Sequence, residues 1–244
     1  MRYLVLTDIH ANLEALEAVL ADAPQYDAVL SLGDLVGYGP SPNEVIERVR
    51  GLPNVTGLKG NHDLAALEEI DLSTFNPHAR AAAEWTAEQM TAESRDYLNS
   101  LPTSAGSPHA FLAHASPRDP VWEYMEFPLQ GPPNFAVFEG PLALVGHTHV
   151  PRVFEHREGG PASAVWEPEG GDAVEVRDGT RHIVNPGGVG QPRDGNPRAA
   201  YGILDTDSGT FTFHRVAYPV QETQRKMLDA GLPEPLATRL AYGM

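Results

Sequence analysis

Short apolar segments followed closely by acidic, amide or imidazole side chains recur along the first 150 residues of this chain. We expect each of these segments, 3–6, 28–32, 55–58, 110–113 and 142–145, to form a buried strand. The polar groups that follow them are Asp8-x-His10, Gly33-Asp34, Gly60-Asn61-His62-Asp63, His114 and Gly146-His147-x-His149. Because the carboxyl ends of the strands form the ligand crevice of an open α/β sheet, these groups should converge in space.

Helical patterns lie between the strands of this first half. A Ser-Pro-x-Glu sequence starts one of them, with Ser41 as the expected N-cap and Glu44 as its reciprocal partner. Alternation of strand and helix implies right-handed crossovers and a largely parallel sheet. The expected helices are 12–20, one that opens at Ser41-Pro42-Asn43-Glu44, one from Asn76-Pro77 to residue 90, and 91–101.

The pattern becomes β from residue 150 onward. A turn at 205–209 predicts a hairpin between the last two expected strands. Residues 158–171 indicate a surface loop, and the proline- and aromatic-rich residues 117–133 indicate a structured loop. The tail, 221–241, indicates two helical pieces broken at 231–233. The expected strands are 152–155, 173–176, 182–184, 200–205 and 210–216.

The composition excludes several classes of protein. The chain has 244 residues, no cysteine and a formal net charge of −16. This length suits one large domain, so we expect a single domain over 1–244. The lack of cysteine fits a reducing cytoplasm, and no segment approaches the ~20 apolar residues of a membrane helix, so we expect a cytoplasmic protein. Stable nucleic-acid binding is not expected, because it needs a basic patch.

The residue types of the polar groups suit divalent metals, because imidazole and carboxylate ligands favour Mn, Fe, Zn or Ni. Four His, two Asp and one Asn offer seven ligands, too many for one tetrahedral ion. Seven ligands are natural for two ions that share a bridging carboxylate. Such a pair can hold a hydroxide that attacks phosphorus in line. The pattern therefore predicts a dinuclear site at the strand ends.

In this order and spacing, the polar groups resemble the signature of the calcineurin-like metallophosphoesterases. The motifs cover residues 1–150, and Asn185-Pro186-Gly187-Gly188-Val189-Gly190 extends the likeness, to a small bacterial branch, as far as about residue 205. The resemblance implies an α/β fold, a four-layer αββα sandwich of two mixed β-sheets flanked by helices. It also implies the ligands: Asp8, His10 and His149 for the first ion, Asn61, His114 and His147 for the second, and Asp34 between them.

The same resemblance assigns catalytic roles. His62 would lie beside the substrate, where an imidazole can stabilise phosphoryl charge or protonate the leaving oxygen. Asp63 would orient His62 or its loop. Asn12 is a further candidate for contact with a substrate phosphate.

Several residues outside these motifs have two interpretations. Arg193 and Arg198 could contact a substrate phosphate, or one of them could form a surface ion pair with Asp194. Trp122 and Tyr124 could wall the substrate pocket or stack on a base, or they could only pack the loop around them. The loop 187–190 could support the site from beneath or cradle a phosphate.

The loop after Asp34 bears on the substrate. Protein phosphatases and diadenosine tetraphosphatases of the superfamily carry an Arg where this chain has Tyr38. A guanidinium is a strong partner for a dianionic phosphate, so its absence favours a phosphodiesterase acting on a small phosphodiester or nucleotide. A phosphomonoesterase or Ser/Thr protein phosphatase is the alternative, and a catalytically silent metal-binding scaffold is a third hypothesis.

We expect two divalent ions as cofactors. Mn is the first choice, with Fe, Ni, Zn or Co as alternatives. Residues 117–133 and the C-terminal helices could form the surface of a homodimer.

Overall fold

The computed structural model describes residues 1–157, 164–176 and 179–244. Its strands are β1 (Arg2–Leu6), β2 (Ala28–Ser31), β3 (Val55–Gly57), β4 (Ser104–Gly106), β5 (Phe111–Ala113), β6 (Leu142–Leu144), β7 (Arg152–Arg157), β8 (Ala164–Trp166), β9 (Ala173–Glu175), β10 (Thr180–Asn185), β11 (Ala199–Asp205) and β12 (Thr210–Val216). Its α-helices are α1 (Leu13–Asp22), α2 (Pro42–Arg50), α3 (Asn61–Ala66), α4 (Pro77–Gln89), α5 (Ala92–Ser100), α6 (Gly131–Phe135), α7 (Val220–Asp229) and α8 (Glu234–Thr238). Short 3₁₀ helices are η1 (Leu72–Thr74), η2 (Pro128–Gln130) and η3 (Arg239–Tyr242).

The strands form two six-stranded sheets, ordered β3-β2-β1-β11-β12-β9 and β4-β5-β6-β10-β7-β8. In the first sheet β1, β2 and β3 are parallel, whereas β11, β12 and β9 are antiparallel to their neighbours. The expected parallel sheet is therefore correct for only half of this sheet, because the predicted hairpin of β11 and β12 returns beside β1. Both sheets are mixed, as the resemblance implies.

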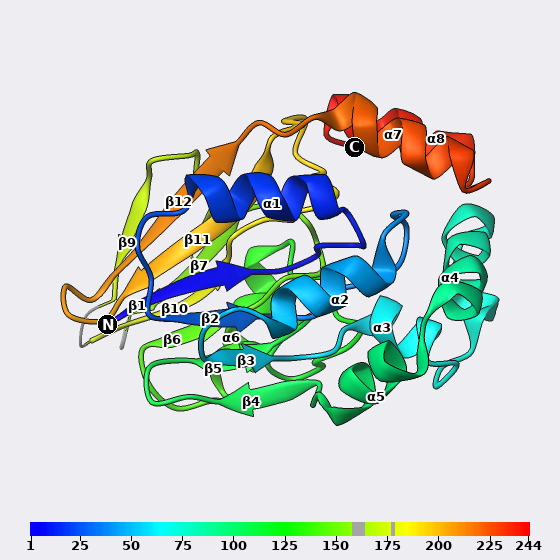
Figure 1. Cartoon of the computed structure of the whole chain (residues 1–244). Helices are drawn as coiled ribbons and strands as arrows, with labels where there is room; N and C mark the ends of the chain where they lie inside the picture. Colours follow the sequence, from blue (N-terminus) through cyan, green and yellow to red (C-terminus); the bar gives the residue numbers. More distant parts are fainter. Residues whose placement is uncertain (158–163, 177–178) are drawn as a thin grey trace.

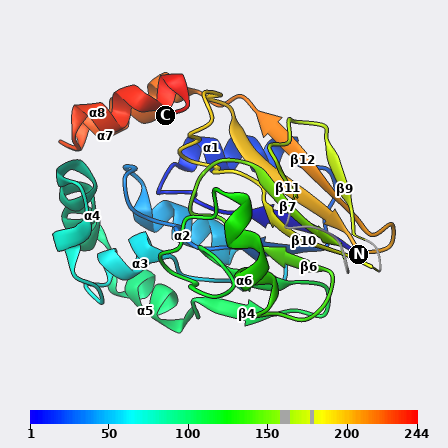
Figure 2. The same ribbon diagram turned by 180° about the vertical axis from the view of Figure 1, so that it is seen from behind.

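The strands alternate their side chains between separate layers of core. Leu4 of β1 packs with Leu16 of α1 on the outer face of the first sheet. Val5, next to it, faces the core between the sheets, together with Leu144 and Phe213. Beyond the second sheet, α6 covers the outer face (Figure 2). Because successive side chains of a strand point to opposite faces of its sheet, they enter separate hydrophobic cores. The four-layer arrangement is therefore confirmed.

The ligand-bearing strand ends gather at one end of the molecule. Strands β1 and β2 run toward the end where α3, α4 and α7 lie, away from the N-terminus (Figure 1). The two predicted C-terminal pieces are α7, which packs beside α1, and α8, which packs against α7. Thr223 of α7 donates a hydrogen bond from Oγ1 to Oδ1 of Asn12, which precedes α1. The tail thereby closes over the strand ends.

Capping residues in the sequence predicted the start of one helix correctly and the capping of another incorrectly. Asn76 caps α4 as expected, because its Oδ1 accepts hydrogen bonds from the amides of His78 and Ala79. The predicted capping box of α2 is wrong: Ser41 occupies the N-cap position, but its side chain makes no capping hydrogen bond. Pro42 at the first turn, with its fixed φ, begins that helix without one.

Short elements escaped the sequence analysis. The predicted surface loop 158–171 is partly a strand, since Ala164–Trp166 forms β8 beside β7, while 158–163 lie outside the described residues. Elements α3, α6 and β4 have three to six residues each, too few to show a period. Among the described parts of the chain, no helix has the length and apolar character to cross a bilayer. The single domain over 1–244 and the homodimer stay predictions.

Candidate metal centre and adjoining pocket

Seven side chains that are far apart in sequence meet where the strands end. Asp8, His10, Asp34 and His149 bring their ligand atoms within 4.8 Å of one another, and Asp34, His114 and His147 form a second such group. The seventh, Asn61, has its Oδ1 3.2 Å from Nε2 of His114. All seven are buried. The predicted convergence of the strand-end motifs is therefore present in the structure.

Asp34 is the residue common to both groups. Its Oδ1 accepts a hydrogen bond of 2.9 Å from the amide of His62. Its Oδ2 lies 3.6 Å from Nε2 of His10 and 3.4 Å from Nε2 of His114. One carboxylate oxygen is thus anchored to the protein, and the other faces both clusters. This is the arrangement that a bridging ligand requires.

Backbone carbonyls fix the orientation of three imidazoles. Nδ1 of His10, His114 and His149 contacts the carbonyl oxygens of Val36, Leu32 and Gln191, respectively. Because a carbonyl only accepts, each Nδ1 donates. In the neutral form of each ring, Nε2 then keeps a lone pair that faces the site. A metal centre needs this orientation of its histidines.

Several atoms that face the site lack a hydrogen-bond partner among the described residues. Nε2 of His10 and Nε2 of His149 lie 3.1 Å apart, so two lone pairs point at each other. Asp8 Oδ1, Asp34 Oδ2 and His147 Nε2 are buried without a hydrogen bond among the described residues. Orphaned buried acceptors are costly, and a cation among them would satisfy them all. The donor set therefore fits divalent ions.

Burial and mutual charge shift the pKa values of these groups. Burial acts to raise the pKa of Asp34, but the charges of His114 and His62 prevail and hold it far below its usual range. Burial likewise acts to lower the pKa of His114, but the carboxylate of Asp34 raises it to about 9. Burial raises the pKa of Asp8 to about 6 and lowers that of His147 to about 3. A neutral imidazole is the form that binds a metal.

The backbone at the ligands is strained. Asp8, His10, Asp34, His147 and His149 all have positive φ, between 48° and 68°. Only four other non-glycine residues of the described chain share this conformation. Left-handed backbone costs about 1 kcal/mol or more per residue and collects at functional sites. Close approach adds to this constraint, since a Cβ on Gly60 would lie 2.2 Å from Oδ1 of Asp34.

Asp63 ties two ligand loops together. Its Oδ1 accepts from the amide of Val36 at 3.0 Å, and its Oδ2 accepts from the amide of Gly60 at 2.9 Å. Burial, followed by the charge of Asp34, raises the pKa of Asp63 to about 7. Asp63 is fully buried and does not line the pocket, so within this structure it acts on the loop rather than on a substrate.

The two arginines that were predicted to contact the substrate lie in different places. Arg193 reaches the site: its guanidinium carbon lies 5.7 Å from the centre of the Tyr38 ring. Arg198 is exposed and bonds to Asn196, away from the ligands. The alternative of an ion pair with Asp194 fails for both, because Asp194 pairs with Arg215.

Asn12 uses most of its hydrogen-bonding groups within the fold. Its Oδ1 accepts from the amide of Ala15 at 3.1 Å and from Thr223, and its Nδ2 donates to the carbonyl of Gly190 at 2.8 Å. This bonding gives Asn12 a structural role; its contact with a substrate phosphate, which would need the second N–H of Nδ2, stays a prediction. The loop 187–190 supports the site from beneath, since the amides of Val189 and Gly190 donate to the carbonyls of Thr7 and Asp8.

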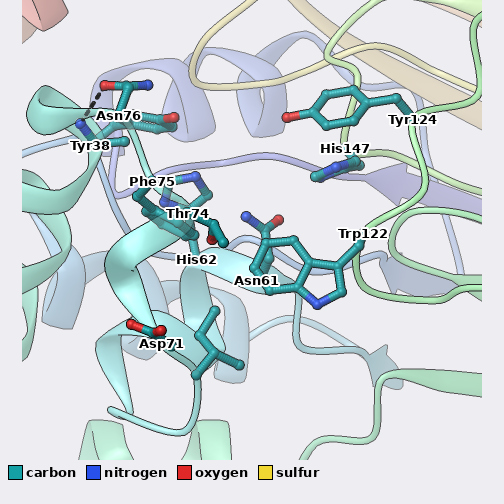
Figure 3. Close-up of a pocket in the computed structure, with 12 residues that line it drawn as sticks. Tyr38, Asn61, His62, Asp71, Thr74, Phe75, Asn76, Trp122, Tyr124 and His147 are labelled. Atoms are coloured by element: carbon teal, nitrogen blue, oxygen red, sulfur yellow. Dashed lines mark hydrogen bonds between the residues drawn. The ribbon is translucent and has the colours of Figure 1, made fainter.

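A pocket of about 580 Å³ adjoins the ligands. Asn61, His62 and His147 line its inner end, and aromatic rings line its sides (Figure 3). The ring of His62 lies between Tyr38 and Phe75, with centroid distances of 4.3 and 5.0 Å. Burial lowers the pKa of His62 to about 4. The structure thus places His62 at the junction of the metal ligands and an open cavity.

The comparisons with known proteins agree with this geometry. The sequence model of the calcineurin-like phosphoesterase superfamily domain matches residues 1–209. The chain belongs to this superfamily. A metallophosphoesterase structure from Sphaerobacter thermophilus is 48% identical, covers 100% of this chain and 99% of its own, and superposes with a TM-score of 0.89.

Two curated relatives extend the comparison. An uncharacterised protein of Methanocaldococcus jannaschii is 37% identical over 98% of this chain and 97% of its own length. The phosphodiesterase YfcE of Escherichia coli is 28% identical over 85% of this chain and 89% of its own length. Membership in this superfamily, together with the two Asp and His groups of this chain, supports metal binding and phosphoester hydrolysis.

The sequence analysis missed one wall of the pocket. Phe75, Thr74 and Asp71 line it from η1 and the turn before α4. The only signal was a lone aromatic residue directly before the Asn76-Pro77 helix start. Trp122 and Tyr124 also line the pocket, as one of their two interpretations predicted.

Proposed function

We propose that this protein is a metal-dependent phosphodiesterase that hydrolyses a small phosphodiester. The observation that carries the proposal is Asp34, whose free oxygen faces two separate groups of metal-ligating side chains. The Escherichia coli relative named as a phosphodiesterase supports the same reaction.

Two divalent cations, with Mn preferred, would supply an acidified water as nucleophile and neutralise phosphoryl charge. Asp8, His10 and His149 would hold one cation, Asn61, His114 and His147 the other, and Asp34 both. The carbonyl contacts of the imidazoles keep their Nε2 atoms aimed inward, so binding needs little rearrangement.

His62 would act on the substrate directly. It lines the pocket beside Asn61 and His147, and its ring is held between Tyr38 and Phe75. A neutral imidazole carries one N–H, which can donate to a phosphoryl oxygen or to the leaving oxygen. Asp63 would be a positioning residue, since it joins the loop after Asp34 to the start of α3.

Arg193 would supply the cation for the substrate. Tyr38 stands where some relatives have an arginine, and Arg193, from another loop, lies over its ring. Burial is the main cause that lowers the pKa of His149, and the positive charge of Arg193 is the second. The guanidinium therefore acts electrostatically on a metal ligand. A single guanidinium at this distance suits the single charge of a diester.

The substrate preference can be measured directly. Mn-loaded protein should hydrolyse bis-p-nitrophenyl phosphate at least about tenfold more efficiently than p-nitrophenyl phosphate, and chelation should abolish both activities. A preference for the monoester would favour the alternative, a phosphomonoesterase or protein phosphatase. Full turnover after exhaustive chelation would rule out the metal mechanism.

Two substitutions separate a catalyst from a silent scaffold. Replacing Arg193 with Ala should lower kcat/KM by roughly 10- to 100-fold, the usual value of a hydrogen bond to a charged group, while Arg198→Ala should have no effect. His62→Ala should lower kcat with metal content unchanged. If the wild type hydrolyses no phosphoester, the scaffold hypothesis is favoured.

A further inference from the structure

The walls of the pocket beside the metal ligands carry almost no charge. None of its lining residues is Lys or Arg. The one acidic residue, Asp71, already accepts hydrogen bonds from the amide and the hydroxyl of Ser73. Such walls do not attract a phosphate, a polyphosphate tail or an acidic peptide. They suit an uncharged part of a substrate whose phosphate lies at the inner end.

Aromatic rings run without interruption from the inner end of this pocket to its rim. Phe75 lies 5.0 Å from His62, and Trp122 lies 6.2 Å from Phe75, edge to face at 86°. On the same side as Trp122, Tyr124 lies 4.1 Å from His147 (Figure 3). Trp122 and Tyr124 keep 41% and 47% of their surface exposed. Large exposed rings held in place by their neighbours offer flat surfaces for stacking.

We propose that this aromatic wall, formed by Phe75, Trp122 and Tyr124, binds the base of a nucleoside phosphodiester. The inference rests on the proposed phosphodiesterase function and narrows its substrate class. The volume of about 580 Å³ is within the range of pockets that hold small organic ligands. A base stacked on the wall leaves the ester phosphate at Asn61, His62 and His147, because the rings are continuous with that inner end.

The wall distinguishes bases poorly. Oδ1 of Asn76 and the carboxylate of Asp71, the lining acceptors best suited to read the edge of a base, are occupied as the caps of α4 and η1. Stacking without edge recognition tolerates every base, because each has a π-face. The affinities for adenine and uracil nucleotides should therefore differ by less than about tenfold.

Binding can be tested without turnover. Adenosine 5′-monophosphate should bind Mn-loaded protein roughly tenfold or more tightly than ribose 5-phosphate or phosphocholine, and it should quench tryptophan fluorescence. Trp122→Ala should lose both the tighter binding of adenosine 5′-monophosphate and the fluorescence quenching, whereas Trp122→Phe should keep most of the tighter binding. The control variant Trp166→Phe, on β8, should keep both the tighter binding and the quenching. Equal affinity for the three ligands, or a gain that survives in Trp122→Ala, would overturn the inference.

Turnover separates this inference from the proposed function. Thymidine 5′-(p-nitrophenyl phosphate) and methyl p-nitrophenyl phosphate share one scissile bond and differ only in the nucleoside. The wild type should prefer the first by roughly tenfold in kcat/KM, and Trp122→Ala should remove this preference by lowering kcat/KM for the thymidine ester. If both are hydrolysed equally, the base subsite is wrong. If neither is hydrolysed, the phosphodiesterase proposal fails, and the binding experiment decides on the wall.

Discussion

Replacement of Asn12 by Ala tests whether this residue supports the fold or contacts the substrate. The side chain is 1% exposed and makes three hydrogen bonds. Loss of the helix cap costs about 1 kcal/mol. The carbonyl of Gly190 also loses its donor in a buried region, which adds roughly 1–3 kcal/mol, whereas the hydroxyl of Thr223 can still donate to Glu14. We therefore expect Asn12→Ala to lower the free energy of unfolding by about 2–4 kcal/mol.

Asn76 provides a matched control for this experiment. It caps α4 through the same kind of contact, but it is exposed and bonds only to the helix that it starts. Asn76→Ala should therefore cost only about 1 kcal/mol. The difference between the two variants isolates the bonds that connect Asn12 to Gly190 and Thr223.

Urea unfolding of chelator-treated protein gives both free energies without a contribution from bound metal. At roughly 2–4 °C per kcal/mol for a chain of this size, Asn12→Ala should melt about 4–16 °C below the wild type. Equal losses in the two variants would refute the reasoning. So would an Asn12→Ala protein of wild-type stability whose KM rises, because that outcome would restore the contact with substrate.

Two further predictions concern carboxylates. Asp34→Asn should lower the Mn content of dialysed protein far more than Asp63→Asn, because only Asp34 faces both ligand groups; equal losses measured by mass spectrometry would contradict this. Burial acts to raise the pKa of Glu123, but hydrogen bonds from Arg118 and its neighbours lower it to about 2. The ionised carboxylate of Glu123 should therefore add about 1–2 kcal/mol to the free energy of unfolding, after allowance for solvent screening. This contribution is present above pH ~4.5 and is lost as pH falls toward 2. The difference in unfolding free energy between wild type and Glu123→Gln should shrink over this range, and a constant difference would contradict the assignment.

The first half of the fold could be predicted because its signals are local. Each of the parallel strands β1, β2 and β3 is an apolar run followed by its ligand, and the crossover helices have their own caps or periods. The pairing of the second half is not local. Strand β11 lies beside β1, whereas β10 joins the other sheet between β6 and β7. Both strands have similar apolar patterns, so no short-range feature of the sequence separates them.

The ligand types could also be predicted, but not what orients them. The imidazoles of His10, His114 and His149 are aimed by main-chain carbonyls, which every residue carries. No side-chain pattern can reveal such a partner. The same limit applies to Asn12, whose amide suits a phosphate contact as well as a helix cap; the fold alone determines which it makes.

The ligand loops hold one another through main-chain bonds. The amide of Asp8 donates to the carbonyl of Gly33, and the amide of His10 donates to the carbonyl of Asp34. The amide of Gly146 donates to the carbonyl of His114. These bonds, together with the buried cores beneath, sustain the left-handed backbone at the ligands. The aromatic wall, in contrast, comes from the residue after η1 and from the loop before η2, and its rings are partly exposed.

This contrast separates two requirements of the site. A change in a ligand loop disturbs several others through their shared hydrogen bonds, so that part of the site tolerates little variation. A change at Trp122 alters mainly the surface that a substrate meets, because its ring contacts Phe75 and its side chain forms no hydrogen bond with a ligand loop among the described residues. Phe75 also contacts the ring of His62, so a change there acts on that side chain as well. Substrate choice can therefore change by substitution in the wall while the metal ligands stay in place, and specificity should be sought in residues 71–76 and 122–124 rather than in the metal-binding motifs.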